Sequence, residues 1–210
     1  MILRRAFRSS VTRSPKWLRR CLGETHGAVA VEFALVAPVF LSMVMGILDI
    51  AQYAYGQAVL RGAVEKAARN SSLEGANTAT ADAKVRNAIR HVLPKADVRS
   101  SRSSYFDFSD IGRPEQWNDA NGNGTCDNDE NFTDENGSGF WDPDIGEDGN
   151  GGANDVVVYR VEVTYKPVFP VPYTTRDDGL RVVSASAVKK NQPFANQDDY
   201  GSDVGTCVDP

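Results

Sequence analysis

The stretch Asp119–Glu130, DANGNGTCDNDE, carries oxygen-bearing side chains at the spacing of a calcium-binding loop. The pattern D-x-[DN]-x-[DN]-G-x5-E puts oxygen ligands at alternate positions, a glycine at position six for a sharp turn and a bidentate glutamate at position twelve. Gly124 fills position six. The expected ligands are the side chains of Asp119, Asn121, Asn123, Asp127 and Glu130 and the backbone carbonyl of Thr125.

A second copy of the pattern follows in DENGSGFWDPDI, in which position twelve is Ile145 instead of an acid. A third run, DIGEDGNGGAND, matches more loosely. The second loop is therefore a less complete candidate, and its expected ligands are Asp134, Asn136, Ser138 and Asp142.

Residues 107–155, which contain both loops, hold fourteen Asp and Glu and a single basic residue, Arg113. So many carboxylates repel one another unless a cation or water screens them. We therefore expect at least one structural Ca²⁺, with no catalytic role. The alternative is a turn region without an ion, because the flanking segments do not read as EF-hand helices and Cys126 occupies a position that is usually apolar.

Two cysteines follow the apolar segment of the chain, Cys126 and Cys207, whereas Cys21 precedes it. An even pair in an exported domain favours a disulfide. The bridge would close a loop of about 80 residues, which the chain-entropy model values at about 4 kcal/mol.

The N-terminal part of the chain has the layout of a membrane anchor. Residues 1–27 carry seven positive charges and one negative, and from Ala28 to Ala51 the only ionisable residues are Glu32 and Asp49. About 20 apolar residues in a helix span the ~30 Å hydrocarbon core. Because basic flanks stay in the cytoplasm, the C-terminal part is expected outside.

The rest of the chain predicts an α+β domain. The apolar helix is expected to continue to about Ser71, with residues 59, 60, 63, 64, 67 and 68 as its packing stripe, and a second helix is expected to end before Pro94. DVVVYRVEVTY and LRVVSASAVKK alternate like half-buried strands and are expected to pair antiparallel. RSSYFDFSDI is a further strand candidate, and residues 107–155 are expected to form a long acidic loop.

A basic leader, Gly27, and then Glu32–Phe33 resemble the prepilin-peptidase site of the type IV pilin superfamily. The stretch from GAVAVEF to ARNSS is similar to TadE-like proteins, the minor pilins or pseudopilins of the Tad (Flp) pilus. The resemblance covers about residues 23–72, and the two strand segments also resemble the C-terminal part of that family. It implies a long N-terminal helix on a small antiparallel sheet.

The resemblance also implies cleavage between Gly27 and Ala28, which makes Glu32 the fifth residue of the mature chain. A new ammonium group and a carboxylate one helical turn away can pair, and this offsets part of the cost of a charge in an apolar setting. Glu32 and Phe33 are therefore expected to act in pilin assembly. The alternative for Glu32 is that its side chain only reaches the cytoplasmic interface.

The implied domain order is a leader (1–27), a transmembrane half-helix (28–51), an extracytoplasmic helix (52–73) and an α+β domain (74–210). The implied function is assembly, initiation or tip formation of a Tad pilus, in support of adhesion. The expected location is the inner membrane, single-pass, with the C-terminal domain in the periplasm or on the pilus at the cell surface. The expected partners are other major and minor pilins, the Tad assembly machinery, prepilin peptidase and inner-membrane lipid, with no nucleic acid.

Two other classes of function stay open at this point. One is a calcium-binding adhesion or interaction module held by an uncleaved signal anchor. The other is a secreted hydrolase with an acid pair in residues 107–155. The sequence contains no GxSxG, HExxH, P-loop or CxxC motif and only two histidines, His26 and His91, so we expect no enzyme.

Overall fold

The structure is a computed structural model that describes residues 26–73, 75–127, 129–169 and 179–208. The chain divides into two compact units, one ending at Leu48 and one beginning at Asp49. The expected leader 1–27 lies almost entirely outside the described residues, as does most of the linker between the last two predicted strands.

The first unit consists, among the described residues, of the N-terminal part of helix α2 (His26–Ser71). Its large side chains are exposed, for example Val29 at 69%, Phe33 at 72% and Leu35 at 73%. The helix is long and apolar enough to cross a membrane. Pro38 lies inside it, as membrane helices tolerate.

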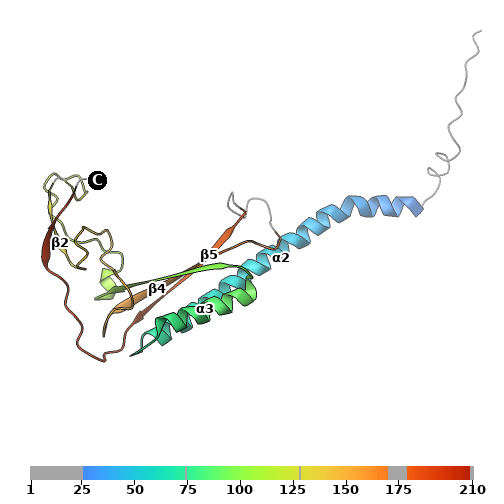
Figure 1. Cartoon of the computed structure of the whole chain (residues 1–210). Coiled ribbons are helices and arrows are strands. Elements are labelled where there is room, and N and C mark those ends of the chain that lie inside the picture. Colours follow the sequence, from blue (N-terminus) through green and yellow to red (C-terminus); the bar gives the residue numbers. More distant parts are fainter. Residues whose placement is uncertain (1–25, 74, 128, 170–178, 209–210) are drawn as a thin grey trace, which may run out of the picture. The chain divides into compact units, whose positions relative to one another are not determined.

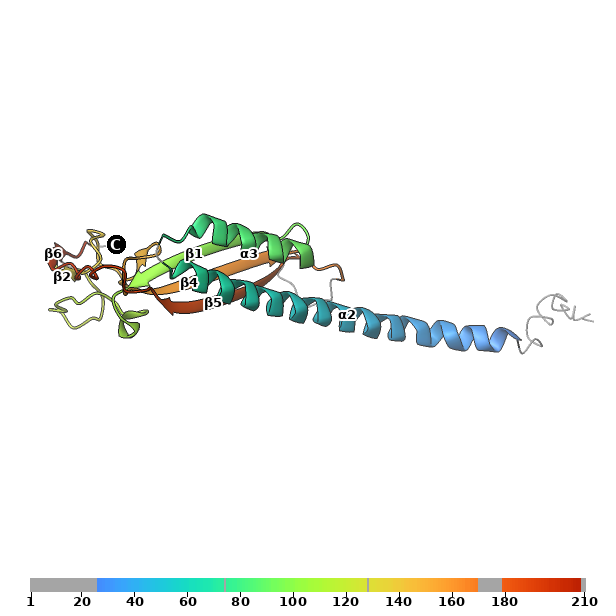
Figure 2. The same ribbon diagram turned by 90° about the horizontal axis from the view of Figure 1, so that it is seen from below.

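The second unit is an antiparallel sheet with helices on one face. Its strands are β1 (Asp97–Tyr105), β3 (Glu147–Asp148), β4 (Val156–Tyr165) and β5 (Arg181–Lys190), in the order β3-β1-β4-β5. Helix α3 (Thr78–Val92) and the later turns of α2 lie side by side across this sheet (Figures 1 and 2). The predicted α+β class is confirmed.

The core forms where the apolar stripes of both helices meet the inner face of β4 and β5. Leu60 and Val64 of α2 and Ile89 of α3 are at most 1% exposed. Burial alternates along β4, so that Tyr159, Val161 and Val163 point inward while Arg160 and Glu162 are exposed. The predicted helix stripe, the strand alternation and the antiparallel pairing of β4 with β5 are all present.

Residues 107–155 are more structured than the long acidic loop that the sequence predicted. They include the 3₁₀ turn η1 (Phe108–Asp110), strand β2 (Asn131–Asp134) and β3. β2 pairs with β6 (Asp203–Thr206) in a separate two-stranded sheet. The acidic segment is therefore fastened to the C-terminal tail of the chain by backbone hydrogen bonds.

The strand predicted in RSSYFDFSDI is shifted toward the N-terminus. β1 begins at Asp97 and ends at Tyr105, because Asp107 and Asp110 form a capping box that starts η1. The carboxylate of each aspartate accepts a hydrogen bond from a backbone N–H group. These local hydrogen bonds take the place of further strand pairing in the sheet.

Candidate assembly helix and cation-binding loops

The predicted cleavage and assembly residues lie on the first turns of α2. Gly27, Ala28, Glu32 and Phe33 are all exposed. Ala28 and Glu32 are four residues apart on one helix, and such residues are neighbours on the helix surface. A carboxylate at position 32 can therefore reach an ammonium group at position 28 in a chain that begins at that residue.

The compact unit begins with a buried charge. Asp49 is 1% exposed and accepts a 2.8 Å hydrogen bond from Arg181 at the start of β5. Asp49 and Arg181 therefore form a buried ion pair. Arg181 also stacks near the ring of Tyr53, 5.7 Å from its centroid.

A second, partly buried charge pair joins α3 to the sheet. The guanidinium of Arg102 donates two hydrogen bonds to Asp82, at 2.6 and 3.0 Å, and lies 4.1 Å from the ring centroid of Tyr159. The hydroxyl of Tyr159 donates to the same carboxylate. Burial opposes ionisation of Asp82, but the hydrogen bonds from Arg102 and Tyr159 outweigh it and hold the pKa of Asp82 below 3.8.

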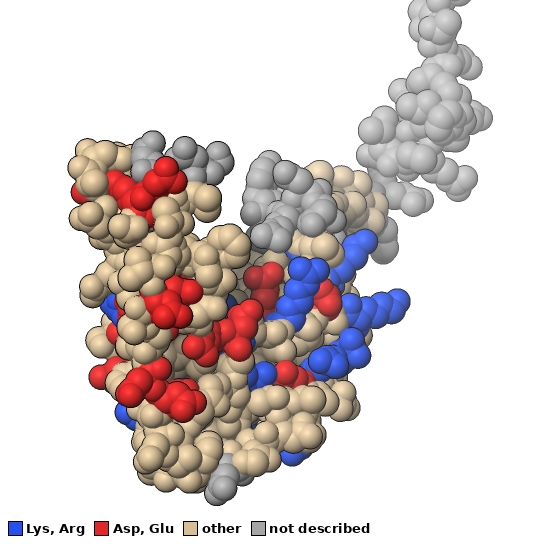
Figure 3. Space-filling model, turned by 60° about the vertical axis from the view of Figure 1, so that its left-hand side comes forward, with Lys and Arg blue, Asp and Glu red and all other residues tan. Residues whose placement is uncertain are grey.

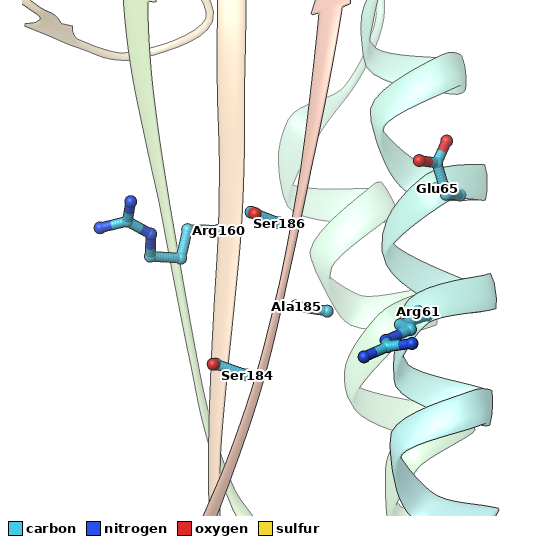
Figure 4. Close-up of a pocket in the computed structure, with 6 residues that line it drawn as sticks. All are labelled: Arg61, Glu65, Arg160, Ser184, Ala185 and Ser186. Carbon is cyan, nitrogen blue, oxygen red and sulfur yellow. The ribbon is translucent and has the colours of Figure 1, made fainter. Parts of the chain in front are cut away.

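A polar pocket of about 430 Å³ opens between α2 and the outer strand β5 (Figure 4). Arg61 points from α2 toward the strands, whereas Arg160 extends away from the helix. Glu65 forms an exposed ion pair with Lys189 at 3.1 Å. The pocket is lined by Arg61, Glu65, Arg160, Ser184, Ala185 and Ser186.

The first predicted calcium loop folds around the carboxylate of Asp119. Its oxygens accept hydrogen bonds from the backbone N–H groups of Gly122, Asn123 and Gly124 at 2.7–3.1 Å. Gly122 and Gly124 have φ of +74° and +76°, a left-handed conformation that glycine adopts without strain. The sharp turn that position six requires is therefore present.

The other predicted ligands of this loop converge on the same turn. Asp127 accepts a 2.9 Å hydrogen bond from each of the side-chain amides of Asn121 and Asn123. The N–H of Thr125 donates to the Asn123 side chain at 2.7 Å. Glu130 is 5% exposed. Its Oε1 accepts hydrogen bonds from the backbone N–H groups of residues 120 and 121 at 2.8 and 3.2 Å.

The second loop repeats this arrangement fifteen residues further along the chain. Asp134 accepts from the N–H groups of Ser138 and Gly139 at 3.0 and 2.9 Å. Asp142 accepts from Asn136 at 3.0 Å and from the Ser138 hydroxyl at 2.7 Å. The four predicted ligands of the second loop thus occupy the places of Asp119, Asn121, Asn123 and Asp127 in the first.

A residue outside the second loop takes the place of its missing glutamate. Glu115 is 0% exposed, and its Oε1 accepts the N–H of Glu135 at 2.7 Å, just as Glu130 accepts the N–H that follows Asp119. Its Oε2 accepts the N–H of Asp142 at 3.0 Å. Ile145, which holds position twelve by spacing, packs instead in an apolar cluster with Tyr105.

Sequence reasoning missed Glu115 because this residue precedes both loops. Its backbone N–H donates to Asp142 and its carbonyl accepts from the indole of Trp141. These contacts form only in the folded chain, so no spacing pattern in the sequence reveals them. The only local signal is an acid directly after Pro114, which is not specific.

A disulfide joins Cys126 in the first loop to Cys207 after β6, with a Cα–Cα distance of 5.4 Å. It lies in an apolar cluster with Phe132, Trp117 and Trp141. The N–H of Cys207 also donates to the carbonyl of Glu130 at 2.7 Å. The structure therefore contains the bridge that the sequence predicts, and it pins the loop to the tail.

Charge is distributed unevenly over the second unit. Figure 3 shows acidic side chains spread over the loop-rich part at the left and basic side chains gathered toward the right. Within the described ranges, no group of three or more His, Cys, Asp or Glu side chains is placed to hold a metal ion by itself. An ion in the first loop would therefore need the amide and backbone oxygens as well as the carboxylates.

Comparison with protein families decides how the helix is classified. Its N-terminal glycine and most of its length match the family described as TadE-like protein, over residues 27–69. Residues 27–69 are a TadE-like segment. No curated protein and no solved structure matches the chain.

The TadE-like segment begins at Gly27 and ends two residues before α2 does. It includes the exposed apolar turns as well as the stripe that packs on the sheet. The TadE-like family is a family of structural proteins associated with the Tad pilus. The match to this family and the long apolar helix together indicate a membrane-anchored protein.

Proposed function

We propose that this protein is a membrane-anchored minor pilin or pseudopilin that prepilin peptidase cleaves after Gly27. It acts in Tad (Flp) pilus assembly, at initiation or as part of the tip, and thereby supports adhesion. The observation that carries the proposal is helix α2: its match to the TadE-like family starts at Gly27, its apolar side chains are exposed over its first turns, and it continues into a packed domain.

The exposed apolar side chains require a partner or lipid. From Val29 to Ile50 the helix presents Val, Leu, Ile, Phe and Met side chains at 43–73% exposure. Monomeric soluble proteins rarely expose a continuous apolar surface of this kind. In the membrane, lipid covers it, and in a pilus the helices of neighbouring subunits do.

Glu32 gives this apolar surface a preferred register. An unpaired carboxylate within a transmembrane segment costs a few kcal/mol. After cleavage the ammonium group of Ala28, from the same subunit or a neighbour, pairs with it and removes much of that cost. Subunits that pack in the register that makes the pair are therefore favoured over others.

The charge pattern supports one orientation. Seven basic residues lie before the apolar helix, and the segment that follows is acidic. By the positive-inside rule the N-terminus stays in the cytoplasm, and the sheet domain then lies in the periplasm. A disulfide between Cys126 and Cys207 fits that oxidising compartment.

The deciding experiment is the intact mass and N-terminal sequence of the protein from its native membrane, beside a Gly27→Trp variant. Gly62→Trp is the matched control, since Gly62 is exposed on the same helix and a Cβ there meets nothing within 4 Å. We expect a native N-terminus at Ala28, an uncut Gly27→Trp variant and a control that is cut.

A native protein that keeps residues 1–27 would contradict the proposal. The function would then be that of an uncleaved, signal-anchored interaction module. Loss of pilus formation in the Gly27→Trp strain, with pili retained in the Gly62→Trp strain, is the expected functional readout.

A further inference from the structure

One carboxylate oxygen in the first loop is buried without a partner. Glu130 is 5% exposed, and its Oε2 accepts no hydrogen bond from the residues that the structure describes. The other oxygen of the same carboxylate is fixed by the N–H groups of residues 120 and 121, which holds Oε2 beside the start of the loop. Burying such an oxygen unpaired costs free energy unless another group satisfies it.

The loop supplies no positive charge for this oxygen. The sequence has no Lys or Arg from residue 114 to residue 159. Arg113, the nearest basic residue before the loop, is engaged with Asp110 and Glu135. In the described part of the chain, the ion pairs include neither Asp119 nor Glu130.

The loop is also held in shape before any ligand arrives. Three backbone N–H groups fix the Asp119 carboxylate, and the disulfide from Cys126 and the hydrogen bond from Cys207 fix the other end. A preformed loop binds an ion at a lower entropic cost than a loop that must first fold. The donors that surround the turn are oxygens of carboxylates, amides and the backbone, which suit a hard cation.

We propose that the loop of residues 119–127, together with Glu130, binds one Ca²⁺, with the unpartnered Oε2 of Glu130 as the ligand that closes the site. Calcium fits better than magnesium, because Ca²⁺ accepts six to eight oxygen ligands in a variable geometry, whereas Mg²⁺ demands near-ideal octahedral geometry and usually keeps several waters. The ion neutralises Asp119, Asp127 and Glu130 and stabilises the loop against the C-terminal tail. This calcium site is proposed independently of the proposed role in pilus assembly.

The test is calorimetric titration of the full-length chain in detergent, stripped with EDTA, with CaCl₂ and separately with MgCl₂. We expect a dissociation constant for calcium of about 10⁻⁴–10⁻³ M, the range of extracellular modules. Magnesium should bind at least about tenfold more weakly. Terbium luminescence excited through tryptophan gives a second readout, because Trp117 precedes the loop by two residues.

Three variants locate the ion. Glu130→Gln and Asp119→Asn should weaken calcium binding at least about tenfold or remove one bound equivalent. Glu162→Gln, at an exposed position of β4, should leave the isotherm unchanged. Asp134→Asn, in the second loop, should leave the site at Glu130 intact.

Two results would overturn the proposal. One is a wild-type protein with neither binding heat nor a shift in melting temperature at 10 mM calcium. The other is an isotherm that Glu130→Gln leaves unchanged or that Asp134→Asn abolishes, which would place the ion elsewhere. The wild-type titration is decisive even if a variant fails to fold, and none of these results bears on cleavage after Gly27.

Discussion

Asp49 and Arg181 form an ion pair of 2.8 Å although 132 residues separate them in the sequence. The pair fixes the first turn of the compact unit to the first residue of β5. Both side chains are buried, with 2% and 9% of their surface exposed. The chain therefore carries a charge pair at the place where the exposed apolar helix becomes a packed one.

Replacing Arg181 with Met should strongly destabilise the domain. Removal of one partner leaves the carboxylate of Asp49 buried and unpaired, which costs about 3–5 kcal/mol. Denaturant unfolding of the full chain in detergent measures the change. The matched control is Lys189→Met, which breaks the more exposed pair with Glu65 and should cost at most about 1 kcal/mol. Equal losses in both variants would show that the pair at Asp49 has no special role.

The Asp82–Arg102–Tyr159 contact should make stability depend on acid pH. The pKa of Asp82 is lower in the folded protein than its usual 3.8, so the folded state favours the ionised form. Its contribution to stability is fully present above this unfolded-state pKa and is lost as pH falls through the lower folded-state pKa. Melting temperatures between pH 6 and pH 2 should therefore fall less steeply in Asp82→Asn than in the wild type.

The control for this pH dependence is Asp97→Asn. Asp97 pairs with Arg99 in an exposed position, with 61% of the side chain accessible, where screening by water leaves little energy to lose. Its acid profile should match that of the wild type. A profile of Asp82→Asn that also matches the wild type would contradict the assigned role of this carboxylate.

The regular elements were predictable because each depends on a short-range pattern. The stripe containing Leu60 and Val64, and the alternation along β4, are periodicities that only one face of a helix or strand can bury. Contacts between distant segments were not predictable in the same way. The pairing of β2 with β6, and of Asp49 with Arg181, joins segments whose own sequences carry no signal of the partner.

The two acidic loops also combine a local pattern with a contact from a distant segment. Asp119 and Glu130 could be singled out from the sequence because both belong to one twelve-residue spacing pattern. Glu115 enters the second loop from outside, through backbone hydrogen bonds that only the folded chain creates. Sequence therefore identified the incomplete second loop but not the residue that completes it.

Loss of the disulfide should loosen the C-terminal tail. Cys126 and Cys207 are 81 residues apart, and removal of a native bridge typically costs about 2–5 kcal/mol. A Cys126→Ser/Cys207→Ser double variant should therefore unfold at lower denaturant, and reduction of the wild type should reproduce the change. The reductant should have no effect on the double variant. Equal stability of the oxidised and reduced wild type would count against a structural role for the bridge.

Glu32→Gln should separate processing from assembly. The amide keeps the size of the side chain but removes the charge that an ammonium group at Ala28 attracts, so the preferred register of helix packing is lost while the peptide bond after Gly27 is unchanged. We expect normal cleavage by mass spectrometry, with pilus formation and recovery of other pilins by cross-linking both reduced at least about tenfold. Glu65→Gln, an exposed change on the same helix, should affect neither. If Glu32→Gln assembles like the wild type, then the carboxylate only reaches the membrane interface, and helix register is set by the apolar side chains alone.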